Sequence, residues 1–128
     1  MLVENPLGRP ADLRGWLDDF QSRFNSNSRA GKLAKGWDRQ ILLEAADSAK
    51  RYTMLVRDAQ LGMIVEGGPS AGNADRLVTL RANEDILTNI FSGNYNPSTA
   101  LLDGVLEVYS DSRDKVKLEA LAMVIWGL

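Results

Sequence analysis

Residues 76–111 read RLVTLRANEDILTNIFSGNYNPSTALLDGVLEVYSD, and they carry the strongest structural signals of the chain. In residues 76–82, Val78 and Leu80 alternate with Leu77, Thr79 and Arg81, which is the period of two expected of a β-strand. Asn83 and two acidic residues follow at once and can open a helix, which the apolar residues of 86–91 continue until Gly93. The first half of the stretch therefore predicts a strand followed directly by a short helix.

The second half of the stretch predicts another short helix and another strand. Pro97 follows Asn96 and occupies the first helical position, where its missing N–H breaks no hydrogen bond. Gly104 can end this helix. Residues 105–109 then form a short run suited to a strand.

The flanks of the stretch supply longer helices. Residues 11–25 carry apolar side chains at helical spacings of three and four, which predicts an amphipathic helix with one broad apolar face. Downstream, Asp111 or Asp114 can cap a final helix, and its last turn, residues 124–128, is strongly apolar.

Between the first helix and the central stretch the pattern indicates β-structure. Residues 25–32 have the composition of a turn or loop, residues 37–46 and 51–58 form a hairpin, and residues 61–66 form a third strand. A loop rich in glycine, residues 67–73, is long enough to cross the sheet. The order α, four β, two α, β, α predicts an α+β fold with a five-stranded mixed or antiparallel sheet covered on one face by helices.

Composition narrows the possible functions. The 128 residues form one domain, 1–128, and the formal net charge of −2 provides no general field for nucleic acid. Because the chain has no cysteine and no histidine, it has no disulfide, no thiolate or imidazole metal ligand and no imidazole base. We expect no metal and no cofactor.

No apolar run reaches membrane-spanning length and no secretory signal is visible in residues 1–6, so we expect a cytoplasmic protein.

The central stretch resembles the sterol carrier protein 2-like family, the SCP-2 sterol-transfer domain. The resemblance rests on two strands, an acidic helix start and the spacing of the residues between them. The strands are Arg76 to Leu80 and Leu106 to Asp111, the helix start is Asn83-Glu84-Asp85, and the residues between are Gly93, Asn96-Pro97, Ala100 and Gly104. The family's usual closing Gly-Asp stands here as Ser110-Asp111. The resemblance implies an apolar cavity between sheet and helices that takes a lipid or similar elongated molecule.

We expect the cavity to be lined by apolar side chains from both layers. The candidates are Phe20, Met54, Val56, Met63, Leu87, Ile90, Phe91, Leu101, Leu121, Ile125 and Trp126. An inward arginine would suit a carboxylate head group, and the candidates for this role are Arg57 and Arg81. The predicted function is non-catalytic binding and carriage or presentation of a hydrophobic ligand.

The final helix has two alternative roles. Its apolar last turn, residues 124–128, either closes the cavity mouth as a lid or packs against a second subunit as a homodimer contact. Trp126, Leu128, Lys115 and Lys117 are the residues for a transient membrane contact.

Two other function classes stay open. In the first, the chain is an accessory or scaffold subunit of a larger lipid- or metabolite-processing system, and side chains fill its cavity. In the second it is an enzyme, which would require an acid or one of Tyr52, Tyr95 and Tyr109 to face a cavity. The adjacent acids, Asp18-Asp19 and Glu84-Asp85, are explained by a polar helix face and a helix start.

Overall fold

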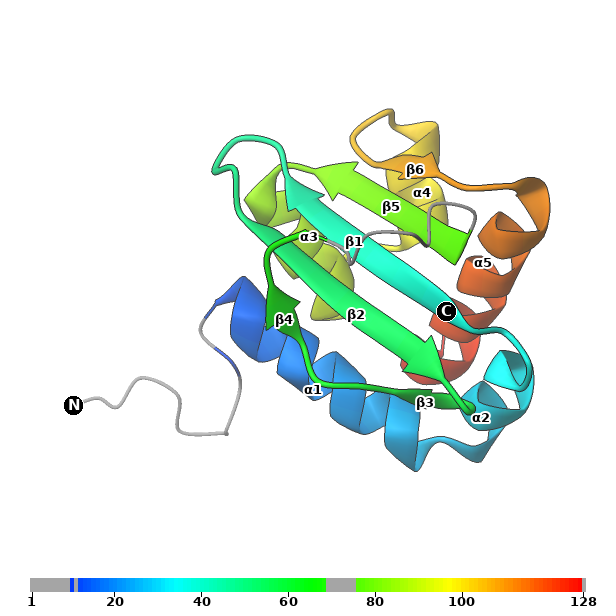
Figure 1. The fold of residues 1–128 in the computed structure, drawn as a ribbon. Helices are drawn as coiled ribbons and strands as arrows, with labels where there is room; N and C mark the ends of the chain where they lie inside the picture. Colours follow the sequence, from blue (N-terminus) through cyan, green and yellow to red (C-terminus); the bar gives the residue numbers. More distant parts are fainter. Residues whose placement is uncertain (1–9, 11, 69–75, 128) are drawn as a thin grey trace.

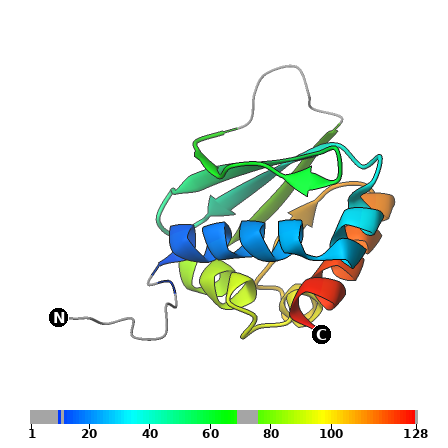
Figure 2. The ribbon, with the colours of Figure 1, turned by 90° about the horizontal axis from the view of Figure 1, so that it is seen from below.

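A β-sheet covered on one face by helices makes up the fold in this computed structural model, which describes residues 10, 12–68 and 76–127 (Figure 1). Most of the predicted loop 67–73 lies outside the described residues, as do residues 1–6 and Leu128. The elements are α1 (Leu13–Ser26), α2 (Ser28–Ala34), β1 (Arg39–Ala45), β2 (Arg51–Arg57), β3 (Gln60–Leu61), β4 (Val65–Glu66), β5 (Leu77–Ala82), α3 (Glu84–Phe91), α4 (Pro97–Leu102), β6 (Glu107–Tyr109) and α5 (Ser112–Trp126). Figure 2 shows the helices gathered beneath the sheet.

The sheet is mixed, which is one of the two arrangements that the sequence predicts. Its order is β3-β2-β1-β5-β6, and β4 pairs with the other end of β2. β1 and β5 run parallel, while β1–β2 and β5–β6 are antiparallel. In this register Ile41 lies beside Met54 on one neighbouring strand and beside Val78 on the other, and all three are buried. The α+β class and the helix-covered sheet are thereby confirmed.

The predicted third strand, residues 61–66, is in fact two short strands, so the sheet has six strands rather than five. Leu61 and Ile64 are both buried although they are three residues apart. In a regular strand an odd separation places two side chains on opposite faces. The chain therefore leaves the ladder at residues 62–64, which turns Ile64 inward and leaves Met63 in solvent.

Helix α2 was not predicted, because residues 25–32 have the composition of a loop. The side chain of Asn27 caps the helix by accepting hydrogen bonds from the backbone N–H of Arg29 and Ala30, at 2.9 and 3.0 Å. Ala30 and Ala34 are fully buried, and the helix packs on α5. Tertiary burial of two alanines thus stabilises a helix that local composition does not indicate.

A buried carboxylate fastens α5 to the sheet. Asp111 is the N-cap of α5 and accepts from the backbone N–H of Asp114 at 2.8 Å, which decides between the two possible caps. Asp114 is itself buried: its Oδ1 accepts from Trp37 Nε1 at 2.7 Å, and its Oδ2 lies 3.1 Å from Arg39 Nε. These bonds fix the first turn of α5 against the start of β1.

Candidate functional site

A small apolar cavity lies between the sheet and the helices. Its free volume is about 80 Å³. Residues of α1, α3, α4 and α5 and the inward face of the sheet line it: Phe20, Phe24, Ile41, Leu61, Leu80, Leu87, Ile90, Phe91, Pro97, Leu101, Leu106, Val108, Lys115, Leu118, Glu119, Leu121, Ala122 and Trp126. Lys115 and Glu119 are the charged residues of this lining, and both are exposed at its rim.

Three aromatic rings from three helices occupy much of the space between the layers. The ring of Phe20 lies 5.1 Å from that of Phe91 and 5.3 Å from that of Trp126, and Phe91 and Trp126 are 5.8 Å apart. We call these three residues the aromatic cluster. Such edge and tilted contacts stabilise a core beyond the burial of area alone.

Gly93 makes room for the tryptophan of the aromatic cluster. A β-carbon at this position would lie 3.2 Å from Cδ1 of Trp126, and the backbone φ is +83°, which favours glycine. The indole Nε1 of Trp126 is buried without a hydrogen-bond partner among the described residues. An unpaired buried donor is costly, so this end of α5 is the least well satisfied part of the cavity wall.

The cavity as it stands is smaller than a ligand site. Pockets that hold organic ligands have volumes of roughly 300–1,000 Å³, whereas this one has about 80 Å³. An elongated molecule therefore requires side chains or helices to move. The chemistry of the lining nevertheless suits an apolar ligand. Its described residues are apolar except for charged groups at the rim.

The structure brings most of the predicted lining residues together. The predicted residues that line the cavity are Phe20, Leu87, Ile90, Phe91, Leu101, Leu121 and Trp126. Met54, Val56 and Ile125 are buried in the adjoining core without lining it. Met63 is a correction: its side chain is 77% exposed on the other face of the sheet, because the chain leaves the ladder there.

Arg57 and Arg81, the predicted head-group contacts, also lie away from the cavity. Side chains alternate along a strand, and the inward positions of β2 and β5 are held by apolar residues such as Val56 and Val78. Arg57 is exposed on the open sheet face, and Arg81 there forms ion pairs with Glu44 at 3.7 Å and with Glu107 at 3.9 Å. The cavity thus has no inward arginine among its described lining residues.

Sequence reasoning missed the sheet side of the cavity. Ile41 of β1, Leu80 of β5, and Leu106 and Val108 at the last strand contribute to the lining. The alternation of residues 76–82 would have placed Leu80 on the same face as buried Val78. Which of the two faces carries the helices cannot be read from alternation alone.

None of the three tyrosines considered as possible acids or bases is among the described residues that line the cavity. No cluster of three potential metal ligands occurs within residues 10, 12–68 and 76–127. Burial raises the pKa of Tyr52, and the hydrogen bond that the Tyr95 hydroxyl donates to Asp103 raises the pKa of Tyr95. Neither tyrosine lines the cavity. Of the adjacent acids, Asp18, Asp19 and Glu84 form ion pairs with basic residues, at 3.4, 2.7 and 3.2 Å.

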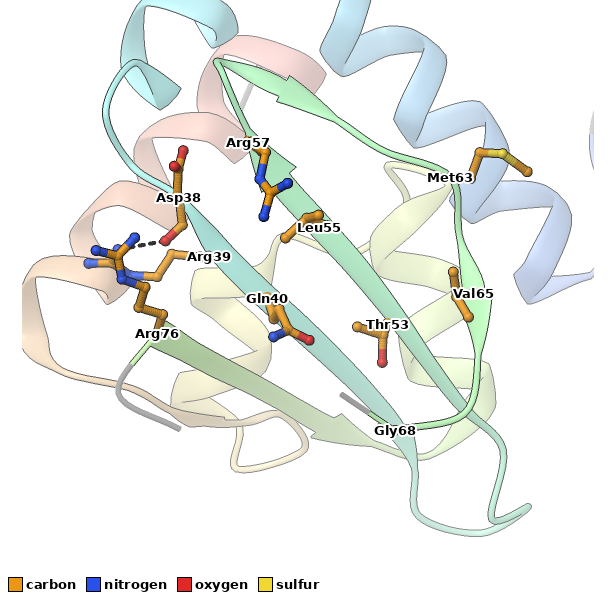
Figure 3. A pocket seen from close by; sticks show the side chains of 10 residues that line it. All are labelled: Asp38, Arg39, Gln40, Thr53, Leu55, Arg57, Met63, Val65, Gly68 and Arg76. Atoms are coloured by element: carbon orange, nitrogen blue, oxygen red, sulfur yellow. Dashed lines mark hydrogen bonds between the residues drawn. The ribbon is translucent and has the colours of Figure 1, made fainter. Parts of the chain in front are cut away.

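A larger groove lies on the open face of the sheet, opposite the helices (Figure 3). Its volume is about 320 Å³. It is lined by Asp38, Arg39, Gln40, Thr53, Leu55, Arg57, Met63, Val65, Gly68 and Arg76. We call it the open-face groove, and nothing in the sequence patterns indicated it.

The outer surface of α5 is partly apolar. Val116 is 65% and Met123 58% exposed, so neither contributes to the cavity, while Lys117 Nζ donates to the carbonyl of Leu33 at 2.7 Å. Among the helices of the described residues, none has the length and hydropathy needed to cross a membrane.

The sequence and the fold both resemble those of known proteins. A family model described as the SCP-2 sterol transfer family matches residues 17–123. The crystal structure of a sterol carrier protein 2 has 17% sequence identity and a TM-score of 0.62, with 92% of this chain and 97% of that chain covered. A palmitated SCP2L2 from Aedes aegypti has 13% identity and a TM-score of 0.56, with 88% of this chain and 95% of that chain covered.

A third similar structure is a much longer enzyme. The stereoselective inverting sec-alkylsulfatase Pisa1 from Pseudomonas sp. has 19% identity and a TM-score of 0.67. The match covers 93% of this chain but spans only 17% of the sulfatase. At these identities the structures show a shared fold. No curated protein sequence matches the chain.

Proposed function

This chain belongs to the SCP-2 sterol transfer family, and from that premise we propose that it binds an elongated apolar molecule, such as a fatty acyl chain, between its sheet and its helices. The observation that carries the proposal is the cavity itself, whose lining is apolar on every side and charged only at the rim in the described residues. Membership confirms the resemblance seen in residues 76–111. The role that follows is carriage or presentation of a poorly soluble molecule.

Opening the cavity has a cost that can be estimated. Enlarging it from about 80 Å³ to about 300 Å³ at roughly 24 cal/mol per Å³ requires about 5 kcal/mol. An empty open state would then account for about one molecule in ten thousand. The packed form is accordingly the resting state without ligand.

Ligand burial offsets this cost only above a certain chain length. Each buried methylene contributes about 0.8 kcal/mol, so about fourteen contribute roughly 11 kcal/mol and about six contribute roughly 5 kcal/mol. Burial of the short chain therefore only equals the free-energy cost of opening the cavity. Long-chain ligands are therefore selected by their length, with no need for a charged contact inside.

The last turn of α5 is the part of the wall that yields. Trp126 lies one residue before the αL cap at Gly127, and its Nε1 has no partner in the described part of the chain. A hydrogen bond that Asn27 Nδ2 donates to the carbonyl of Val124, at 3.1 Å, holds this turn to the start of α2. The start of α5, in contrast, is held by buried Asp114.

Native mass spectrometry tests the proposal. The purified protein is analysed directly and after incubation with palmitate, octanoate, cholesterol and a long-chain quinone. We expect a one-to-one complex with palmitate or another long ligand and none with octanoate at the same concentration. A mass that stays ligand-free with every long ligand contradicts the proposal.

The small volume of the cavity favours one second candidate function. If side chains fill the interior permanently, the chain acts as an accessory domain that docks on another protein, and the sec-alkylsulfatase carries such a fold within a longer chain. This alternative predicts no ligand under any condition, together with a stable complex in which the chain changes the activity or the stability of its partner.

A further inference from the structure

The open-face groove is the larger of the two sites and lies on the opposite side of the sheet from the cavity. Its volume of about 320 Å³ falls at the lower end of the range for small-molecule sites, roughly 300–1,000 Å³. Figure 3 shows side chains of β1 and β2 forming its floor, with Arg76 at one end and Met63 and Val65 along the opposite side. A molecule bound here would not compete with a ligand in the cavity.

One arginine of the groove is held in a fixed position. Arg39 Nε lies 3.1 Å from Oδ2 of buried Asp114, and its Nη1 donates to the carbonyl of Asp38 at 2.8 Å. Its guanidinium also lies 5.6 Å from the ring centroid of Trp37. These contacts use two of the five N–H donors of a guanidinium, and they set the orientation of a side chain that is 22% exposed.

Two further arginines at the groove have no counterion in the described part of the chain. Arg57 and Arg76 are exposed, and neither forms an ion pair with a described residue. The opposite end of the same sheet face is arranged differently, because Arg51 and Arg81 both pair with Glu44, at 3.4 and 3.7 Å. Positive charge is thus balanced at one end of the face and left unbalanced at the groove.

Apolar side chains complete the groove. Leu55 is 37% exposed and Val65 57% exposed, and both line it beside the arginines. Asp38 is the acidic residue of the described lining, and in Figure 3 its carboxylate points away from Arg39 and Arg76. Guanidinium groups bind carboxylate and phosphate oxygens in a bidentate geometry.

We propose that the open-face groove binds an organic phosphate, that is, a phosphate group carried on an apolar body. Arg39, Arg57 and Arg76 hold the anionic group, and Leu55 and Val65 contact the apolar part. The inference is independent of the cavity function, since the two sites share no lining residue.

Octyl phosphate is a suitable probe, and its affinity is measured by calorimetry. The double variant Arg57→Gln/Arg76→Gln binds it on the order of tenfold more weakly, because two charge-assisted contacts are lost. Asp38→Asn binds it about twofold more tightly, since one repelling charge is removed. Arg51→Gln, on the balanced end of the face, and Leu87→Ala, in the cavity, leave the affinity unchanged.

Two further measurements show whether the bound phosphate belongs to a free molecule or to a membrane lipid. Inorganic phosphate lacks the apolar body and binds much more weakly than octyl phosphate. Vesicles of phosphatidate in phosphatidylcholine present the same group on a membrane. If the vesicles compete with octyl phosphate, the natural ligand is a lipid headgroup, and if they do not, it is a free molecule. Octyl phosphate binding that is absent, or equal in the wild type and the double arginine variant, overturns the proposal.

Discussion

Leu87→Ala is the substitution that best separates cavity binding from general core packing. Leu87 on α3 is fully buried and lines the cavity. Leu17 on α1 is also fully buried but does not line it, and Leu17→Ala is therefore a matched control. Each substitution removes the same atoms from the same core, so each lowers the free energy of unfolding by about 2.7–5 kcal/mol.

The two variants differ in their effect on ligand affinity. If Leu87→Ala leaves about 50 Å³ of additional void in the cavity, it removes about 1.2 kcal/mol from the cost of opening at 24 cal/mol per Å³. That difference corresponds to a roughly eightfold lower Kd. Leu17→Ala leaves its void elsewhere and does not lower the Kd.

Urea unfolding followed by tryptophan fluorescence gives the stability of both variants, and calorimetric titration with palmitate gives the affinity. Two results would contradict this prediction: an equal change of the Kd in both variants, or weaker palmitate binding by Leu87→Ala. Either result would show that the ligand does not enter the space between α3, α5 and the sheet.

Three further predictions concern residues that support the site. Asp114→Ala leaves the largely buried Arg39 unpaired and lowers the free energy of unfolding by about 3–5 kcal/mol in urea, and a loss below about 1 kcal/mol would contradict this. In Gly93→Ala the new β-carbon meets Trp126 and the backbone keeps a positive φ, so Tm falls by about 4–8 °C in a thermal melt, and an unchanged Tm would contradict both sources of strain. Burial raises the pKa of Tyr52 above its unfolded value of about 10, so stability is full below pH 10 and falls as the pH rises through the folded pKa. Tyr52→Phe makes this decline shallower in urea unfolding between pH 9 and 11, and an identical decline would rule out Tyr52 as its cause.

The central stretch was the most predictable part of the fold. Residues 76–111 combine strong local signals, and the structure places β5, α3, α4 and β6 within one to three residues of the predicted bounds. The predicted secondary structure was wrong where tertiary contacts determine the conformation. Ala30 and Ala34 make α2 a helix by packing on α5, and Ile64 breaks the third strand by turning into the core.

The candidate site was predictable to a similar degree. The helix side of the cavity, including Phe91 and Leu121, followed from apolar helical faces. Its sheet side and the outward direction of Arg57 depend on which face of each strand the helices cover. The start of α3 also depends on a tertiary contact. We expected the Asn83 side chain to cap this helix, but it makes no capping hydrogen bond. Instead, the Asp47 side chain from the hairpin turn accepts from the backbone N–H of Glu84 at 2.8 Å.

Methyl-resolved NMR of the protein titrated with palmitate shows where in the molecule the ligand binds. We expect slow-exchange shifts of the methyl groups of four residues that line the cavity, namely Leu87, Ile90, Leu101 and Leu121. The methyl groups of Leu55 and Val65, on the open face, stay unchanged at one equivalent. Shifts confined to Leu55 and Val65, or no shifts at saturating palmitate, would contradict a ligand site between the sheet and the helices.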